Sequence, residues 1–160
     1  MTSPNTMITE HFSYKETQHS GYAITHGVPN IPPAEIECAI AYTAQSMERV
    51  RAALGNKSIR ITSWYRSPVV NKAVGSSPTS QHIKGEAVDF TCEGYGNPLA
   101  ICKQLIKLQD LIRFDQIILE PSWVHISFTL SSTKPRGQVL TLIEGGKYAQ
   151  GLTDRKGNKL

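Results

Sequence analysis

Two histidines and one aspartate stand out as side chains that could act together chemically. His82 and Asp89 flank Gly85, and His125 lies within the sequence Trp123-Val124-His125-Ile126. Two imidazoles and one carboxylate, with a fourth position left to water, are the ligand set of a catalytic zinc site. The three residues are therefore a candidate site for one zinc ion, provided that the fold brings them together.

Each of these residues also has a simpler interpretation when it is taken alone. Asp89 lies between Val88 and Phe90 in an expected strand, so alternation puts it on the face opposite to theirs. A carboxylate there is costly to bury unless it is paired or bound to a metal. A buried ion pair or a capping role accounts for Asp89 alone at least as well as a ligand role. A hydrogen-bonded core histidine is the ordinary interpretation of His125 on a strand. Taken together, the residues favour the metal site.

A carboxylate that could exchange a proton comes from a predicted hairpin. Residues 116–120 and 123–129 have the pattern of strands, and Pro121-Ser122 between them strongly favours a turn. In such a hairpin Glu120 lies opposite Trp123, and cross-strand partners point to the same face of a sheet. Glu120 would then share a face with the histidine of the second strand and could accept a proton from a water. The alternative is a solvent-exposed glutamate at a strand end.

The elements that must position these residues alternate between helical and extended patterns. Apolar residues recur at helical spacing, which predicts helices over 34–54, 68–74 and 98–108. Polar and apolar residues alternate in the predicted strands 58–63, 86–91, 116–120 and 123–129, and 138–143 is expected to add an edge strand. The sequence therefore predicts an α+β fold, in which helices pack on a mostly antiparallel sheet and one sheet face carries the zinc site.

The length of 160 residues predicts a single domain over residues 1–160. Residues 1–33 are rich in Ser, Thr, His, Pro and Gly, and we expect an irregular N-terminal segment there. Its histidines, His11, His19 and His26, are expected to be solvated or to cap helices. The polar residues 145–160 are expected to form a flexible tail.

Composition excludes several classes of protein. The hydrophobic content of 39% and charged content of 19% are typical of a globular domain, and no apolar run approaches the roughly 20 residues of a membrane helix. The net charge of +4 comes without a basic stripe interleaved with aromatic residues, so we expect no nucleic-acid partner. The odd number of cysteines, Cys38, Cys92 and Cys102, argues against a disulfide framework. No secretory signal is visible at the N-terminus.

Four stretches of the chain form one recognisable pattern. They are Ser63-Trp64-Tyr65-Arg66-Ser67, Asn71 with Ala73-Val74-Gly75, the S-x-H-x-x-G-x-A-x-D string from Ser80 to Asp89, and Trp123-Val124-His125. Together they resemble the zinc D-Ala-D-Ala metallopeptidase family, which includes wall-trimming carboxypeptidases and phage cell-wall peptidases. The resemblance is strongest over residues 58–129 and implies a Hedgehog-like DD-peptidase fold.

The resemblance implies a role for each matching residue. His82, Asp89 and His125 would bind one zinc ion. Arg66 would be catalytic, since its charge could stabilise the charge that develops on the scissile carbonyl. Ser80 would also support the His82 loop. The expected substrate-binding residues are Arg66, Ser80 and Trp123.

The sequence departs from the family at the catalytic carboxylate. Several members place it three residues before the last histidine, where this chain has Ser122. Glu120 lies five residues before that histidine, and only the hairpin geometry lets it serve as the catalytic base. Asp115 and Glu86 are the reserve candidates.

The resemblance therefore implies a zinc-dependent peptidase that hydrolyses amide bonds in peptidoglycan stem peptides or cross-links. We expect a phage- or prophage-type endopeptidase that stays in the cytoplasm, without a signal peptide, and reaches the cell wall after release. A D-Ala-D-Ala carboxypeptidase and a non-catalytic, zinc-stabilised binding module on the same fold are the alternatives. The expected partners are peptidoglycan peptides, without membrane insertion, and the protein is expected to be a monomer.

Overall fold

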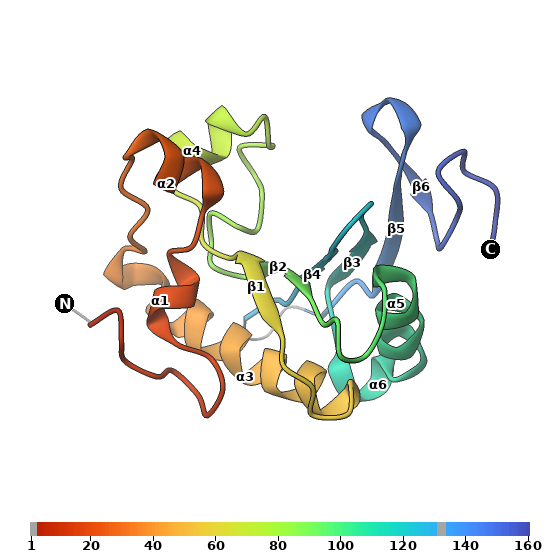
Figure 1. The fold of residues 1–160 in the computed structure, drawn as a ribbon, viewed down its shortest axis with the longest axis horizontal. Coiled ribbons are helices and arrows are strands. Elements are labelled where there is room, and N and C mark those ends of the chain that lie inside the picture. The colour runs from red at the N-terminus through yellow and green to blue at the C-terminus, as the bar shows by residue number, and fades with distance from the viewer. Residues whose placement is uncertain (1–2, 131–133) are drawn as a thin grey trace.

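The structure, a computed structural model, describes residues 3–130 and 134–160. Six strands form one sheet in the order β1-β2-β4-β3-β5-β6 (Figure 1). Neighbouring strands are antiparallel except for β3 and β5, which are parallel. The strands are β1 (Arg60–Ser63), β2 (Ala87–Thr91), β3 (Gln116–Leu119), β4 (Val124–Ser127), β5 (Gln138–Ile143) and β6 (Lys147–Gln150). The expected α+β fold with a mostly antiparallel sheet is confirmed.

The helices of the described chain are mostly short. The helix expected over 34–54 begins as the 3-10 turn η1 (Ala34–Ile36) and continues as α3 (Glu37–Ala53). The others are α1 (Tyr14–Thr17), α2 (Gly21–His26), α4 (Pro68–Ala73), α5 (Pro98–Lys107) and α6 (Gln109–Ile112), and a second 3-10 turn is η2 (Glu144–Gly146). None of these helices is long and apolar enough to span a lipid bilayer.

Side-chain caps and prolines begin helices α4 and α5. Ser67 caps α4 by accepting a hydrogen bond from the Val70 N–H, and Asn97 caps α5 in the same way. A proline follows each cap, which suits the first helical turn because proline lacks the N–H that would have no partner within the helix there. Helices α4 and α5 therefore begin where the sequence predicts.

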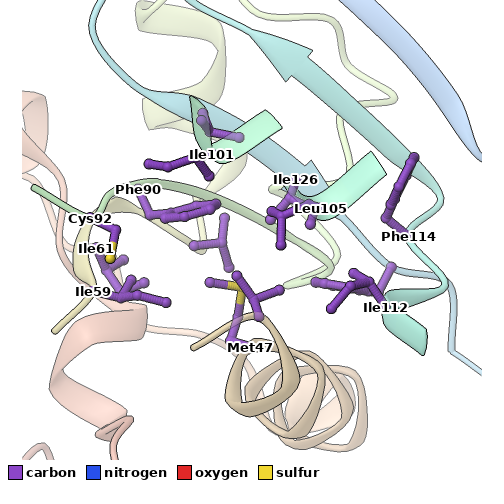
Figure 2. Close-up of a cluster of buried hydrophobic side chains, with 14 of the residues drawn as sticks. Met47, Ile59, Ile61, Phe90, Cys92, Ile101, Leu105, Ile112, Phe114 and Ile126 are labelled. Carbon is purple, nitrogen blue, oxygen red and sulfur yellow. The ribbon is translucent and has the colours of Figure 1, made fainter. Parts of the chain in front are cut away.

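The core lies between one face of the sheet and helices α3, α5 and α6 (Figure 2). Val88 and Phe90 of β2 are fully buried in it, together with Met47 of α3 and Leu105 of α5. Because side chains alternate along a strand, Ala87 and Asp89 project from the opposite face. Strand β2 is buried on both faces, so the carboxylate of Asp89 is also withdrawn from solvent.

The N-terminal segment, expected to be irregular, contains the two short helices α1 and α2. Its first two residues lie outside the described part of the chain. The buried Asn30 amide donates to the carbonyl oxygen of Tyr65 at 2.9 Å and accepts from the Ser67 N–H at 2.8 Å. Helices of four and six residues are too short to show a helical period in sequence. Through the two bonds of Asn30, the N-terminal segment supports the chain on both sides of Arg66.

Residues 145–160, expected to form a flexible tail, contain a strand and an isolated bridge. Residues 147–150 form β6, which pairs with β5, and Thr153 pairs with Lys159 in an isolated bridge. Strand β5 is therefore interior to the sheet and not the expected edge strand. Strand β6 is largely exposed, so its sequence lacks the apolar alternation that marks a half-buried strand.

We predict that the conformation of Gly85 is required for the stability of the loop that carries His82. Gly85 has a φ of 71°, and an added Cβ would lie 2.8 Å from Cγ1 of Ile40 in α3. Gly85→Ala should lower the free energy of unfolding by the strain of a left-handed alanine, about 1–2 kcal/mol, plus an overpacking cost of about 1–3 kcal/mol. Urea denaturation measures both contributions.

Gly75→Ala is the matched control for this prediction. Gly75 has a φ of 75° and no atom within 4 Å of an added Cβ, so its variant should lose the backbone contribution alone. Equal losses in the two variants would contradict the predicted clash with Ile40.

Candidate metal centre

The sheet face opposite the core carries a cleft of about 960 Å³. Its floor includes Asp89 of β2, His125 of β4, Ile118 of β3 and Leu140 of β5. One wall is the loop over residues 75–81 that follows α4, and the opposite wall includes Gly146 and Tyr148 near the turn between β5 and β6. The three candidate metal ligands all line this cleft.

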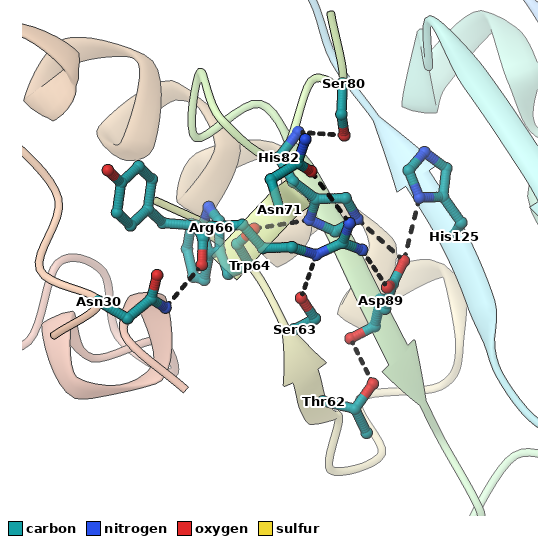
Figure 3. Close-up of polar contacts among 11 residues, drawn as sticks. Asn30, Thr62, Ser63, Trp64, Arg66, Asn71, Ser80, His82, Asp89 and His125 are labelled. Atoms are coloured by element: carbon teal, nitrogen blue, oxygen red, sulfur yellow. Dashed lines mark hydrogen bonds and ion pairs between the residues drawn. The ribbon is translucent and has the colours of Figure 1, made fainter. Parts of the chain in front are cut away.

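Strand pairing places Asp89 beside His125. Strands β2 and β4 are antiparallel neighbours, and Asp89 pairs directly with His125 in their register. Partners in an antiparallel pair point to the same face. Oδ1 of Asp89 lies 3.0 Å from Nδ1 of His125 (Figure 3). Two residues 36 positions apart in the sequence thus form one polar contact because their strands are neighbours.

His82 reaches the same carboxylate from a loop. Its Nδ1 lies 2.6 Å from the carbonyl oxygen of Trp64, so this nitrogen carries the proton and donates. The Nε2 atom lies 3.3 Å from Oδ1 of Asp89. The loop is fixed beneath His82, because the carbonyl oxygen of Gly85 accepts hydrogen bonds from the Trp64 indole and the Thr43 hydroxyl, each at 3.0 Å. The ring is therefore held with Nε2 directed toward the other two ligands.

Burial and mutual charge set the electrostatics of this cluster. Burial lowers the pKa of His82, which favours the neutral imidazole that binds metals. Burial acts to raise the pKa of Asp89, but the contacts of its carboxylate with His82 and His125 outweigh burial and hold that pKa well below its usual range. Asp89 is therefore an ionised carboxylate between two imidazoles.

The cluster fits a zinc ion by the chemistry of its donors. The ligand atoms of His82, Asp89 and His125 all lie within 4.8 Å of one another. Nε2 of His82 is buried and has no hydrogen-bond partner, as expected for a lone pair reserved for a metal. The bond from Nδ1 of His82 to a backbone carbonyl is the usual outer contact of a zinc-binding histidine. Among the described residues no other group of three or more His, Cys, Asp or Glu forms such a cluster.

Arg66 lies beside the carboxylate of Asp89. Its Nη2 is 3.4 Å from Oδ2 of Asp89, its Nε donates to Ser63 at 3.3 Å, and its Nη1 donates to Asn71 at 3.4 Å (Figure 3). The side chain is 15% exposed and lines the cleft. A mostly buried guanidinium held by three partners offers a fixed positive charge beside the candidate metal ligands.

Glu120 lies at the end of β3, as the predicted hairpin requires. Its N–H donates to the carbonyl oxygen of Trp123 at 3.2 Å, and both residues line the cleft. Ile118 pairs with His125 in the β3–β4 register, which places Glu120 on the same face as that histidine. Burial raises the pKa of Glu120 to about 6, and the negative charge of Asp89 adds to this effect. A carboxyl group of this pKa can exchange protons near neutral pH.

The two reserve carboxylates are engaged elsewhere. Asp115 is buried and accepts two hydrogen bonds from the Arg136 guanidinium, at 2.7 and 3.0 Å, and one from its backbone N–H. Glu86 accepts a hydrogen bond from the N–H of Leu130 at 3.2 Å. Glu120 is thus the better placed of the three carboxylates for proton transfer at the site.

The remaining expected residues also face the cleft. The Ser80 hydroxyl accepts a hydrogen bond from the N–H of His82 at 3.3 Å, and it lies on the wall formed by residues 75–81. Trp123 lines the cleft beside Glu120, with its indole nitrogen buried. Whether Ser80 and Trp123 bind substrate stays a prediction.

The other histidines and the cysteines lie outside the cluster. Nδ1 of His11 lies 2.8 Å from Oε2 of Glu48, and the His26 ring is 3.0 Å from the carbonyl oxygen of Tyr22. The described cysteines are free thiols, of which Cys38 is exposed and the other two are buried.

Several residues that shape the site were not assigned roles from the sequence. Trp64 orients His82, and Asn71 links Arg66 to the cleft wall by donating to the carbonyl oxygen of Ser77 at 2.8 Å. Both residues occur in the sequence pattern that contains Arg66, and this was the feature from which their roles could have been inferred. Tyr148 lines the cleft from β6, and no pattern in the polar tail marked it.

Comparison with known proteins places this geometry in a family. No curated protein matches the chain. Residues 10–127 match a family described as peptidase M15. This range contains all three candidate ligands, Arg66 and Glu120. The match covers well over half of the chain, and it agrees with the resemblance seen in the sequence. The chain belongs to the peptidase M15 family, zinc metallopeptidases of the D-Ala-D-Ala type.

Proposed function

We propose that this chain is a zinc-dependent endopeptidase that hydrolyses amide bonds in peptidoglycan stem peptides or their cross-links. The observation that supports this most directly is the convergence of His82, Asp89 and His125 in an open cleft that Glu120 and Arg66 also line. Membership of the peptidase M15 family supports a metallopeptidase that acts on substrates of the peptidoglycan type.

Each residue would contribute a separate part of the hydrolysis. A zinc ion bound by the three ligands would acidify a water and polarise the scissile carbonyl. Glu120 would accept the proton of the attacking water and return it to the leaving amine. Arg66 would bind negative charge on the substrate, either a carboxylate or the oxygen of the scissile carbonyl as it becomes anionic. His82 would keep its orientation through the carbonyl oxygen of Trp64.

The extent of the cleft favours an endopeptidase. The cleft continues past the metal ligands on both sides, toward residues 75–81 and toward Gly146 and Tyr148. A peptide chain could therefore extend in both directions from the scissile bond. The D-Ala-D-Ala carboxypeptidase is the second candidate, favoured by Arg66, because a fixed guanidinium beside the metal suits a terminal carboxylate.

The setting of the reaction is part of the proposal. The substrate would be an anionic cell-wall polymer, and the net charge of +4 would assist the approach to it. We propose that the protein is of phage or prophage type, accumulates as a monomer in the cytoplasm and acts on the wall after release.

A digest of defined muropeptides followed by mass spectrometry should show cleavage within stem peptides or cross-links. Release of single terminal D-Ala residues alone would favour the carboxypeptidase.

We predict that zinc binding depends on His82. The wild-type protein should retain one zinc ion per chain after dialysis and should unfold at a higher temperature with zinc than after chelation, since a ligand of the native state stabilises it. His82→Ala should lose the ion and this thermal shift, as measured by elemental analysis and calorimetry. The control is His11→Ala, which removes a histidine paired with Glu48 outside the cluster. Stoichiometric zinc in His82→Ala would overturn the ligand assignment.

We predict that Glu120→Gln keeps zinc and loses hydrolysis. Removal of a general base lowers the rate by about 10² to 10⁴-fold, whereas the three ligands are unchanged. Release of new amines from purified peptidoglycan measures the rate, and elemental analysis measures the metal. Glu93→Gln is the matched control, because Glu93 does not line the cleft. Wild-type rates in Glu120→Gln would assign the base to another residue.

The acidic limb of the pH profile should depend on the same carboxyl group. Glu120 acts as a base only when it is ionised, and its pKa of about 6 refers to the protein without metal. A bound cation favours the ionised form and lowers this pKa. Activity should therefore fall as the pH is lowered through the pKa of Glu120, at or below pH 6. This fall should be absent from the residual activity of Glu120→Gln. A limb that is unchanged in Glu120→Gln would contradict this prediction.

A further inference from the structure

The part of the cleft that lies beyond Glu120 is formed by strands outside the family match. The match ends at residue 127, whereas β5 and β6 begin at Gln138 and Lys147. These strands extend the sheet from β3 and contribute Leu140, Gly146 and Tyr148 to the cleft. This half of the cleft is therefore built by a segment that the family match does not describe.

Strand register brings the side chains of this segment to the face of the metal ligands. His125 pairs with Ile118, and Ile118 pairs with Leu140, so these three side chains share one face. Leu142 lies two residues beyond Leu140 on the same face, and its partner in β6 is Tyr148. Tyr148 therefore projects from the face that carries the metal ligands.

The floor between the metal ligands and β6 has apolar side chains from β3 and β5, and Ile118 shares its face of the sheet with Gln116 and Glu120. Ile118 is nearly buried and Leu140 is half-buried, and both line the cleft. Tyr148 lies at the far edge of this region and is 55% exposed. An exposed tyrosine at the edge of a cleft has apolar area available for a ligand and little conformational entropy to lose.

The sheet order places Arg66 and Tyr148 on opposite sides of the metal ligands. Arg66 follows β1 at one edge of the sheet and Tyr148 lies on β6 at the other, with β2 and β4 between them (Figure 1). Strands lie about 4.8 Å apart, so β6 is roughly 14 Å from β4, a span that an extended peptide covers in about four residues. A peptide that crosses the sheet from Arg66 therefore passes over Ile118 and Leu140 before it reaches Tyr148.

We infer that Ile118, Leu140 and Tyr148 form an apolar subsite for the substrate, on the side of the scissile bond that lies away from Arg66. The subsite takes an aliphatic side chain and disfavours an anionic one, because Ile118 and Leu140 cannot pair with a carboxylate and the carboxyl group of Glu120 lies on the same face of the sheet. Tyr148 packs against this residue and determines specificity. The inference rests on the proposed peptidase function.

The environment of Tyr148 agrees with this placement. Burial raises the pKa of Tyr148, and the negative charges of Glu120 and Asp89 raise it further. The phenol therefore stays neutral and lies within electrostatic reach of the residues proposed for catalysis. Gly145 and Gly146, with φ values of 83° and 72°, form the tight turn before β6 and leave the cleft edge beside Tyr148 without side chains.

Kinetics on paired substrates test the inference. Synthetic stem peptides carry Ala, Gly or Asp at each of the first four positions from the scissile bond, on either side in separate series. Wild-type protein should prefer Ala to Asp by tenfold or more in one series. Tyr148→Ala should raise KM about tenfold in that series with kcat and zinc content nearly unchanged, because it removes binding shared by ground and transition states. Tyr148→Phe should restore the wild-type KM, since the ring supplies the contact.

A second exposed tyrosine, outside the cleft, provides the control. Tyr95→Ala removes an exposed tyrosine that does not line the cleft, and it should leave KM unchanged. An unchanged KM and an unchanged Ala-to-Asp preference in Tyr148→Ala would overturn the subsite.

Direct binding separates this inference from the proposed function. If the wild-type protein cleaves none of the peptides, the proposed function fails, and calorimetric titration of the zinc-loaded protein with the same peptides still tests the subsite. Weaker binding of the Ala peptide to Tyr148→Ala than to wild type supports the subsite. Equal affinities, or no binding to the wild-type protein, overturn it.

Discussion

The negative charge of Asp89 on a buried strand is the constraint on which the rest of the site depends. An isolated carboxylate in such a position is costly, and the fold compensates it with His125 across the strand pair, His82 from a loop and Arg66 from the end of β1. These partners come from three different segments of the chain. The arrangement that satisfies the buried charge is therefore the same arrangement that assembles a set of metal ligands.

A second layer of contacts keeps the ligands in place. The carbonyl oxygen of Trp64 holds the His82 ring, and the carbonyl oxygen of Gly85 receives bonds from Trp64 and Thr43. Helix α3 thus supports the metal-binding loop through a threonine and through the close approach of Ile40 to Gly85. Precise orientation of ligands by such outer contacts is what separates a metal site from a collection of polar side chains.

The short-range parts of the site could be predicted from the sequence because they follow from alternation along strands. Two-residue periodicity placed Asp89 on the face opposite Val88 and Phe90, and the Pro121-Ser122 turn placed Glu120 opposite Trp123; the structure agrees on both. Residues 145–160 could not be interpreted in this way. Strand β6 is exposed and polar, and it is ordered by pairing with β5, a contact that no local pattern records.

By itself, the sequence determined which residue types were available for chemistry and which strand face each would occupy, since both depend on near neighbours in the chain. Only the tertiary structure decided that β2 and β4 are neighbours, that β3 and β5 pair in parallel, and that Tyr148 faces the cleft. The physical reason is that strand order and register are set by packing of the whole core, in which distant segments compete for the same partners. The residues that could do chemistry were therefore recognisable from near neighbours in the chain, whereas the shape of the cleft depended on contacts between distant segments.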